Sequence, residues 1–263
     1  SPQELGFGAG AAALCTGSRD LIAECCGTAS LTTSFVDHYR AEGQAFDYSW
    51  EERWIRDVGL TTLLPRAARA ALERAGLAVD EISSLIVPPV LAGAAKAVAG
   101  ALGYKGTLAE DLVEGCGFTG AAHPLLMLAR ALEVARPGDI LLLLGFGQGA
   151  DAIVFRTTEA VLSRRPGRGV AGSLQDRVDT DSYMRLLSFY DNISLDWGMR
   201  SERRNGSTGL IGVGLTSVVI VQPPGWRQEF PRDDARCLRR AGLGGSWPSL
   251  RRRARPRAPF VRD

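Results

Sequence analysis

Cysteine and histidine are the first residue types to consider for chemistry in this chain, because they can serve as nucleophiles, acid/base groups and metal ligands. The sequence contains five cysteines and two histidines, and no two cysteines form a C-x-x-C pair. The chain therefore offers few ligands for a zinc site, and we expect no bound metal. An odd number of cysteines without an export signal favours reduced thiols that act as small buried residues. The cysteines are Cys15, Cys25, Cys26, Cys116 and Cys237.

A second candidate for chemistry is the stretch LLLLGFGQGADAIVFR at 141–156, in which Gly145, Gly147 and Gly149 alternate. A strand followed by G-x-G can bind a dinucleotide, but that motif requires a helix after the glycines. Here the chain continues as Ala-Ile-Val-Phe, which favours a second strand. We interpret the glycines as a tight connection between two core strands, where the missing Cβ lets the backbone pass close to a pocket. Asp151 is then a turn or pocket-wall residue and not a ribose ligand.

The elements that must position these residues alternate between helix and strand. Apolar residues at helical spacing predict the helices, Gly76 is a plausible helix C-cap, and short apolar runs predict the strands. This alternation predicts an α/β fold in which helices are layered on a sheet. The expected order is helix 60–77, strand 83–87, helix 90–103, glycine-rich turn 114–120, helix 122–135, strand 140–146 and a neighbouring strand that begins at Ala152.

The flanking segments have weaker patterns. GFGAGAAAL at 6–14 is interpreted as a strand of small residues, and 17–58 as a loop with short strands that leads to a helix beginning near Trp50. By composition, 161–176 is a linker. Aromatic and aliphatic residues at helix-like intervals predict a helical linker segment at 177–205. Residues 206–263 are expected to be a poorly ordered basic tail, interrupted by the strand-like stretch IGVGLTSVVIVQ.

Composition excludes several classes of function. The chain has 263 residues, 45% of them hydrophobic, which is enough for a real core. The apolar run at 85–95 contains two prolines and is too short to span a bilayer, so we expect a cytoplasmic protein without a membrane partner. Residues 201–263 carry 13 arginines against five acidic residues. Because the densest arginine run, RRRARPR at 251–257, contains no interleaved aromatic residue and no recognisable binding motif, a solvated end is favoured over a nucleic-acid interface.

Four stretches, in this order and spacing, resemble the C-terminal half of the thiolase superfamily, most closely its hydroxymethylglutaryl-CoA synthase and 3-oxoacyl-ACP synthase III branch. They are GAGAAAL at 8–14, SSLIVPP at 83–89, GCGFTGAAHPLL at 115–126 and ARPGDILLLLGFGQGAD at 135–151. The resemblance implies that residues 1–160 form a thiolase-like layered α-β-α lobe. Such a lobe is half of a five-layered α-β-α-β-α fold whose active site lies between the halves.

The same resemblance implies an acyl-CoA condensing enzyme, an acyltransferase whose nucleophilic cysteine belongs to the preceding half, which we expect to lie outside this chain. The C-terminal half normally supplies a histidine after the strand at 83–87 and, in the synthase III branch, an asparagine in the glycine turn. Those positions fall here on Pro88 or Pro89 and on Phe118. Since none of these side chains donates a hydrogen bond, the alternative is a non-catalytic thiolase-fold subunit that binds acyl-CoA or scaffolds a partner enzyme.

His123 is the candidate catalytic residue, as a displaced acid/base, with a capping or core-edge histidine as the alternative. Cys25, Cys26 and Cys116 are expected to be structural. Lys96 is a candidate for binding CoA phosphates, with an exposed helix lysine as the alternative. The other candidate substrate-binding residues are Phe118, Thr119, Gly120, Gly147 and Gly149.

The resemblance also suggests partners. It implies acyl-CoA or an acyl carrier thioester as substrate, with no additional cofactor. The segment SYMRLLSFYDNISLDWGMRSE at 182–202 resembles a linker that continues into, or docks with, a zinc-ribbon and OB-fold acyl-CoA-binding module. Half of a two-lobed fold would leave one face of its sheet-helix sandwich exposed, so we expect a homodimer or a hetero-oligomer with a thiolase or such an OB-fold protein. Beyond Asn205 only Cys237 remains for a module that needs paired cysteines. An out-of-frame or degenerate end is one hypothesis for this departure, and translation of the nucleotide sequence in all three frames tests it.

Overall fold

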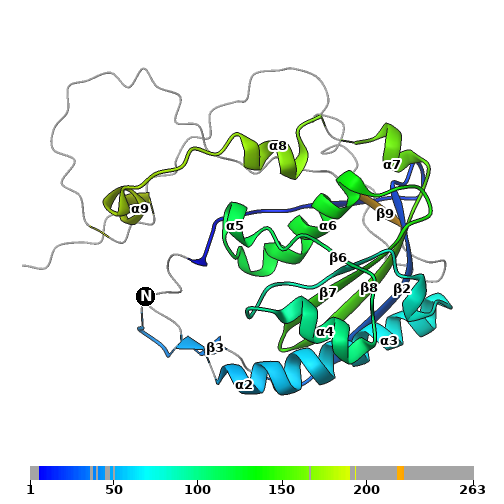
Figure 1. Ribbon diagram of the computed structural model, residues 1–263, viewed down its shortest axis with the longest axis horizontal. Helices are drawn as coiled ribbons and strands as arrows, with labels where there is room; N and C mark the ends of the chain where they lie inside the picture. Colours follow the sequence, from blue (N-terminus) through cyan, green and yellow to red (C-terminus); the bar gives the residue numbers. More distant parts are fainter. Residues whose placement is uncertain are drawn as a thin grey trace, which may run out of the picture. The chain divides into compact units, whose positions relative to one another are not determined.

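The computed structural model describes the greater part of the chain (Figure 1). The chain divides into two units, Ser1–Pro224 and Gly225–Asp263, and every described residue lies in the first. Of the tail predicted at 206–263, only 218–221 lies among the described residues. The described residues are 6–35, 38–39, 41–44, 48–49, 51–165, 167–189, 193 and 218–221.

A mixed sheet of seven strands forms the centre of the described part. Its strands, in spatial order, are β1 (Leu14–Thr16), β9 (Val218–Val221), β2 (Ala23–Thr32), β8 (Gly149–Thr157), β7 (Ile140–Gly147), β5 (Ser84–Ile86) and β6 (Thr107–Leu108). Strand β5 runs parallel to both neighbours, whereas β8 is antiparallel to β2 and β7. A separate ladder joins β3 (His38–Tyr39) to β4 (Tyr48–Ser49).

One face of the sheet is covered by a long helical segment and a second helix. The segment runs through α2 (Glu52–Trp54), the π-helical η1 (Ile55–Leu63) and α3 (Leu64–Ala75), and the second helix is α4 (Ala94–Leu102). Three fully buried alanines, Ala67, Ala68 and Ala71, let α3 approach the sheet closely. Gly76 ends α3 in the left-handed conformation at φ 66°, so the predicted C-cap is confirmed.

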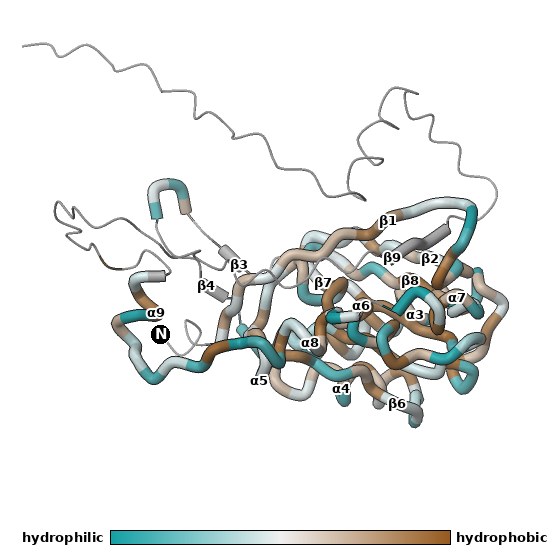
Figure 2. The backbone as a smooth tube through the Cα atoms, turned by 90° about the horizontal axis from the view of Figure 1, so that it is seen from above, coloured by the Kyte–Doolittle hydropathy of each residue, from teal (hydrophilic) through white to brown (hydrophobic). Residues whose placement is uncertain are grey.

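The opposite face is covered by α6 (His123–Val134), which follows α5 (Val113–Cys116) and the 3₁₀ turn η3 (Gly120–Ala122). Helices α7 (Ala160–Ser163) and α8 (Gly169–Gln175) come after β8, and α8 packs on α6. The hydrophobic segments in Figure 2 fall largely within the stacked elements α3, α6 and β8. The predicted α/β layered lobe, with helices on both faces of a sheet, is confirmed.

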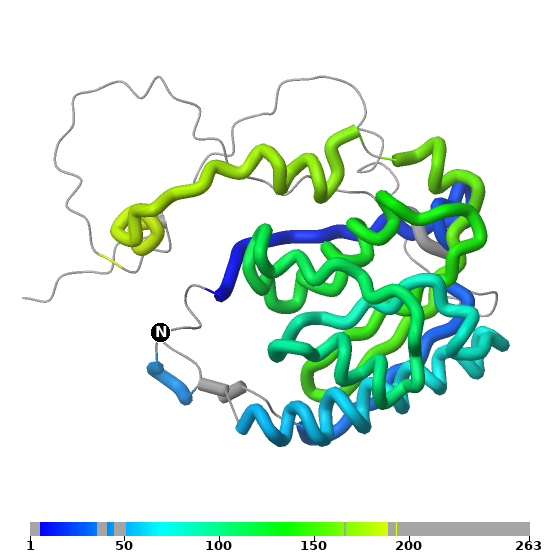
Figure 3. The backbone as a smooth tube through the Cα atoms, viewed as in Figure 1, coloured from blue at the N-terminus to red at the C-terminus, as the bar shows by residue number. Residues whose placement is uncertain are grey.

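Two predictions on the N-terminal side are wrong. Residues 8–13 form no strand, and the segment instead runs beside α6 (Figure 3), joined to the glycine turn by a bridge between Phe7 and Phe118. In the segment 17–58, the predicted short strands and the helix near Trp50 are present as β3, β4 and α2, but the prediction missed β2, a ten-residue strand with a bulge between Cys25 and Gly27. Its sequence AECCGTASLT has few branched or aromatic residues, so local propensity gives a weak signal.

The segments after β8 contain more regular structure than composition indicates. The stretch assigned to a linker, 161–176, contains α8, whose first amides, those of Val170 and Ala171, donate to the Glu133 carboxylate. Helix α9 (Tyr183–Phe189) lies in the predicted helical segment, and β9 lies in the predicted strand-like stretch.

None of the helices in the described ranges combines the length and apolarity needed to cross a bilayer.

We predict that Gly27→Ala destabilises the lobe, because a Cβ at this position would lie 2.4 Å from the Ala71 carbonyl oxygen of α3. The backbones of β2 and α3 must separate to admit it, and we expect a loss of about 1–3 kcal/mol in the free energy of unfolding, measured in urea. The matched control is Gly100→Ala on α4, where a Cβ meets nothing within 4 Å and alanine is the better helix former. Equal stabilities of the two variants would contradict the close approach.

Candidate functional site

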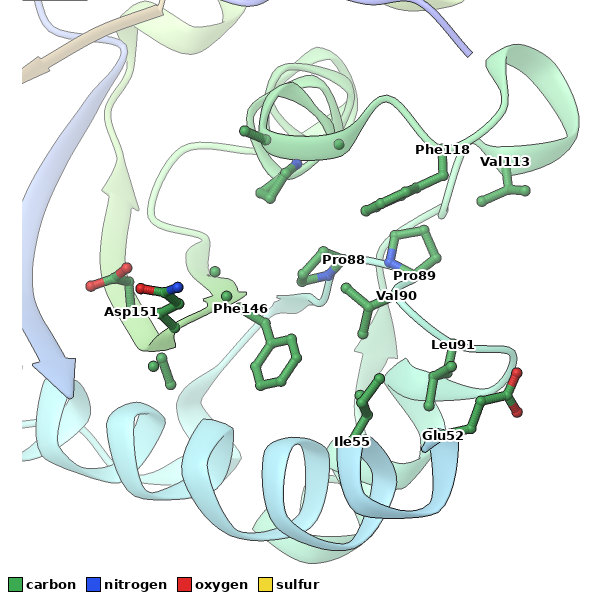
Figure 4. Close-up of a pocket in the computed structure, with 18 of the residues that line it drawn as sticks. Glu52, Ile55, Pro88, Pro89, Val90, Leu91, Val113, Phe118, Phe146 and Asp151 are labelled. Carbon is green, nitrogen blue, oxygen red and sulfur yellow. The ribbon is translucent and has the colours of Figure 1, made fainter. Parts of the chain in front are cut away.

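A cavity of about 890 Å³ opens at the carboxyl ends of the parallel strands β5 and β7. Ligands of open α/β sheets commonly bind at this edge. The cavity is lined by the end of β2, the β7–β8 hairpin, residues 88–92 after β5, the start of the long helical segment and the glycine turn before α6 (Figure 4).

The β7–β8 hairpin has one residue, Gln148, between paired Gly147 and Gly149. Gly149 has φ 137°, and a Cβ there would lie 2.0 Å from the Leu31 carbonyl oxygen of β2. A Cβ on Gly147 would meet nothing within 4 Å. The glycine stretch is therefore the predicted tight connection between two core strands, and the close backbone approach occurs at Gly149.

Apolar side chains form the middle of the cavity wall. Pro88, Pro89 and Val90 extend from the end of β5, and Phe118 and Phe146 approach from the glycine turn and from β7 (Figure 4). The rings of Phe146 and Phe35 pack with centroids 5.5 Å apart. The positions where the resemblance expects catalytic histidine and asparagine thus carry side chains that shape this wall without donating hydrogen bonds.

Polar side chains lie at the edges of the cavity. The Ser30 hydroxyl of β2 donates to Asp151 Oδ1 of β8 at 2.6 Å, and both side chains are exposed. Asp151 is therefore a pocket-wall residue, as predicted. Glu52 lies across the apolar wall from Asp151 (Figure 4), and the Gln148 amide lines the cavity at the hairpin tip.

His123 lies in the core beneath the glycine turn. Its side chain is fully buried, its Nε2 lies 2.6 Å from the Asp111 carbonyl oxygen, and its Nδ1 accepts the Thr119 amide at 3.1 Å. These contacts fit a neutral ring protonated on Nε2, and burial lowers the pKa of the imidazole. His123 is not among the described residues that line the cavity. The displaced acid/base role therefore has no geometric support, and the geometry agrees with the core-edge alternative.

The remaining sequence candidates divide between the cavity and other places. Four of them line it, whereas Thr119 is engaged with His123 and Lys96 is exposed on α4 outside the lining. The four are Phe118, Gly120, Gly147 and Gly149. Sequence reasoning missed Gln148, although a polar residue between two turn glycines was a usable signal, and Ser30, which lies on the unrecognised β2.

Three cysteine thiols are half-buried, and burial raises the pKa of Cys25, Cys26 and Cys116. A raised pKa lowers the thiolate fraction near neutral pH and so lowers nucleophilicity. None of the three lines the cavity. Within the described ranges, no three His, Cys, Asp or Glu side chains are grouped as a metal ion would require.

We predict that His123 makes stability depend on pH. Because its pKa is lowered on folding, the unfolded chain binds the proton more readily, so the contribution is complete above about pH 6.5 and is lost as pH falls toward the folded-state pKa. The free energy of unfolding of wild type should therefore decrease below about pH 6.5 more steeply than that of His123→Gln. His38→Gln, which removes the other histidine, is the control. Parallel wild-type and His123→Gln curves would contradict this prediction.

We predict that Gly149→Ala disrupts the hairpin at the cavity, since alanine is strained at φ 137° and its Cβ meets the Leu31 carbonyl. The expected loss is about 1–3 kcal/mol in the free energy of unfolding, from chemical denaturation. Gly147→Ala, two residues away at the same turn, should lower the free energy of unfolding by less. If both variants are equally stable, the close approach at Gly149 is not a constraint.

Comparison with known proteins gives matches to one group of enzymes. Residues 72–156 match the family described as 3-oxoacyl-[acyl-carrier-protein] synthase III, C terminal. The chain is 32% identical over 171 residues to a hydroxymethylglutaryl-CoA synthase of Methanopyrus kandleri, covering 61% of this chain and 47% of that protein. A synthase of the same name from Methanothermobacter thermautotrophicus is 27% identical over 166 residues, with coverages of 60% and 46%.

A solved structure aligns over a similar share of this chain. The 3-oxoacyl-[acyl-carrier-protein] synthase III of Aquifex aeolicus aligns with a TM-score of 0.47 at 20% identity, covering 54% of this chain and 46% of that one. The chain spans about half the length of the curated relatives it matches. The family match and the sequence relatives support a resemblance of residues 72–156 to the C-terminal half of thiolase-superfamily enzymes of the 3-oxoacyl-ACP synthase III and hydroxymethylglutaryl-CoA synthase branch.

Proposed function

We propose that this lobe is part of a condensing acyltransferase and that its cavity holds the acyl group of a CoA or acyl carrier thioester. The supporting observation is the cavity itself, which is apolar in its middle, lies at the carboxyl ends of β5 and β7, and belongs to a lobe matched by a synthase family. Its volume of about 890 Å³ falls within the usual size of a small-molecule site.

In this proposal the lobe binds and orients the acyl group. Gln148 offers an amide donor to a thioester oxygen, whereas the Ser30 hydroxyl is already donated to Asp151. The described lining contains no cysteine or histidine, so the nucleophile and its acid/base partner belong to residues outside it. A second lobe that carries a nucleophilic cysteine is the partner that completes the site, on a longer chain or in an oligomer.

A non-catalytic thiolase-fold subunit that binds acyl-CoA or scaffolds a partner enzyme is the second candidate. The observation that favours it is the apolar character of Pro88, Pro89 and Phe118, which line the cavity where the resemblance expects polar catalytic groups. Both candidates share acyl thioester binding and differ in whether this lobe takes part in bond formation.

We predict that the 263-residue chain binds acetyl-CoA reversibly and forms no covalent acyl-enzyme by itself. Burial raises the pKa of three of its thiols, and neither these nor exposed Cys15 lines the cavity. Equilibrium dialysis with labelled acetyl-CoA measures binding, and intact mass under denaturing conditions detects an acetyl adduct. An adduct that disappears in Cys116→Ser, but persists in the control Cys15→Ser, would place the nucleophile in this chain and contradict the proposal.

Reconstitution separates the two candidates. A lobe that carries the nucleophilic cysteine is incubated with labelled acetyl-CoA, with and without this chain, and condensation products are quantified. Condensation that requires this chain supports the enzyme, and we expect a Gln148→Ala chain to lower its rate about tenfold or more. Condensation that is the same with and without the chain supports the non-catalytic subunit.

A further inference from the structure

The charge around the cavity has a single sign in the described part of the chain. Among the described lining residues, only Glu52 and Asp151 carry a charge, and both are acids. No described lysine, arginine or histidine lines the cavity. The net charge of +2 for the whole chain therefore does not represent the local environment of this site.

The two acids lie on either side of an apolar surface. Asp151 is at the β2–β8 side and Glu52 at the helix side, with Pro88, Val90 and Phe146 between them (Figure 4). Both carboxylates are exposed to solvent, and Asp151 is held by the Ser30 hydroxyl at 2.6 Å. A ligand that lies along the apolar wall must therefore pass close to fixed negative charge on either side.

We propose that the cavity selects an uncharged, apolar acyl group and rejects an acyl group that ends in a second carboxylate. This inference rests on the proposed thioester-binding function and specifies its substrate class. A terminal carboxylate in the cavity would lose water against the apolar wall without a described cation to compensate, and it would be repelled by Asp151 or Glu52. A methyl-ended chain loses no such hydration, and each methylene that it buries strengthens binding about fourfold.

The test compares octanoyl-pantetheine with suberoyl-pantetheine, which has the same number of acyl carbons and differs by the terminal carboxylate. Pantetheine is used in place of CoA because it has no phosphate and so adds no charge of its own. Isothermal titration calorimetry with the full chain measures both dissociation constants at neutral pH and low salt. We expect octanoyl-pantetheine to bind at least tenfold more tightly.

The double variant Glu52→Gln, Asp151→Asn removes both charges and keeps the side-chain shapes. In this variant, the ratio of the suberoyl to the octanoyl dissociation constant should shrink at least threefold, mainly because suberoyl-pantetheine binds more tightly. Glu73→Gln is the matched control, because this exposed acid of α3 lies outside the cavity lining. Its loss should leave the ratio of the two dissociation constants unchanged.

Suberoyl-pantetheine binding as tightly as octanoyl-pantetheine to wild type would overturn the selectivity and leave thioester binding intact. An unchanged ratio in the double variant would also overturn it, because the acids would then not cause the discrimination. Failure of both thioesters to bind would overturn the proposed function itself, and this inference with it.

Discussion

The β7–β8 hairpin is buried on both faces, and this constraint determines the rest of the described lobe. Alternate residues of β7 point into two separate cores: Leu142 and Leu144 pack toward α3 and α4, and Leu141 and Leu143 toward α6. A strand covered on both faces needs an almost continuous apolar run, which is what LLLL supplies. The polar side chains of the hairpin then lie toward its two ends, with Arg156 and Thr157 at one end and Gln148 and Asp151 at the other, where the cavity opens.

The buried histidine illustrates how a chemically capable side chain can be used for structure. Both ring nitrogens of His123 are engaged by backbone groups, from Asp111 on one side and Thr119 on the other. These contacts tie the loop before α5 to the glycine turn and so support the position of Phe118 in the cavity wall, 5.2 Å from the imidazole ring. Acid/base chemistry would require a free nitrogen that faces the cavity. The ring therefore contributes to the shape of the site through its hydrogen bonds.

The parts of the fold that the sequence predicts well are those with a dense local signal. The unbroken apolar run of β7 predicts its bounds to within one residue, and the apolar spacing and glycine cap of α3 predict where this helix ends, although the predicted start at 60 falls within the π-helical η1. Strand β2 was missed because its burial alternates over small residues and its register shifts at the Cys25–Gly27 bulge. Its place in the sheet depends on pairing with β8, which lies more than 100 residues later in the chain. No local sequence pattern predicts this pairing. Ser30 was missed for the same reason, since its contact with Asp151 exists only when the two strands pair.

The site shows why a retained framework and retained chemistry are separate questions. The hairpin, the close approach at Gly149 and the small residues beneath α3 are required by packing, so they persist in any lobe that folds this way. Pro89 and Phe118 at the cavity wall are only partly buried, so packing constrains the residue type at these two positions less tightly. The acyl group that is accepted, and whether it reacts, then depends on the few wall residues and on what a second lobe supplies.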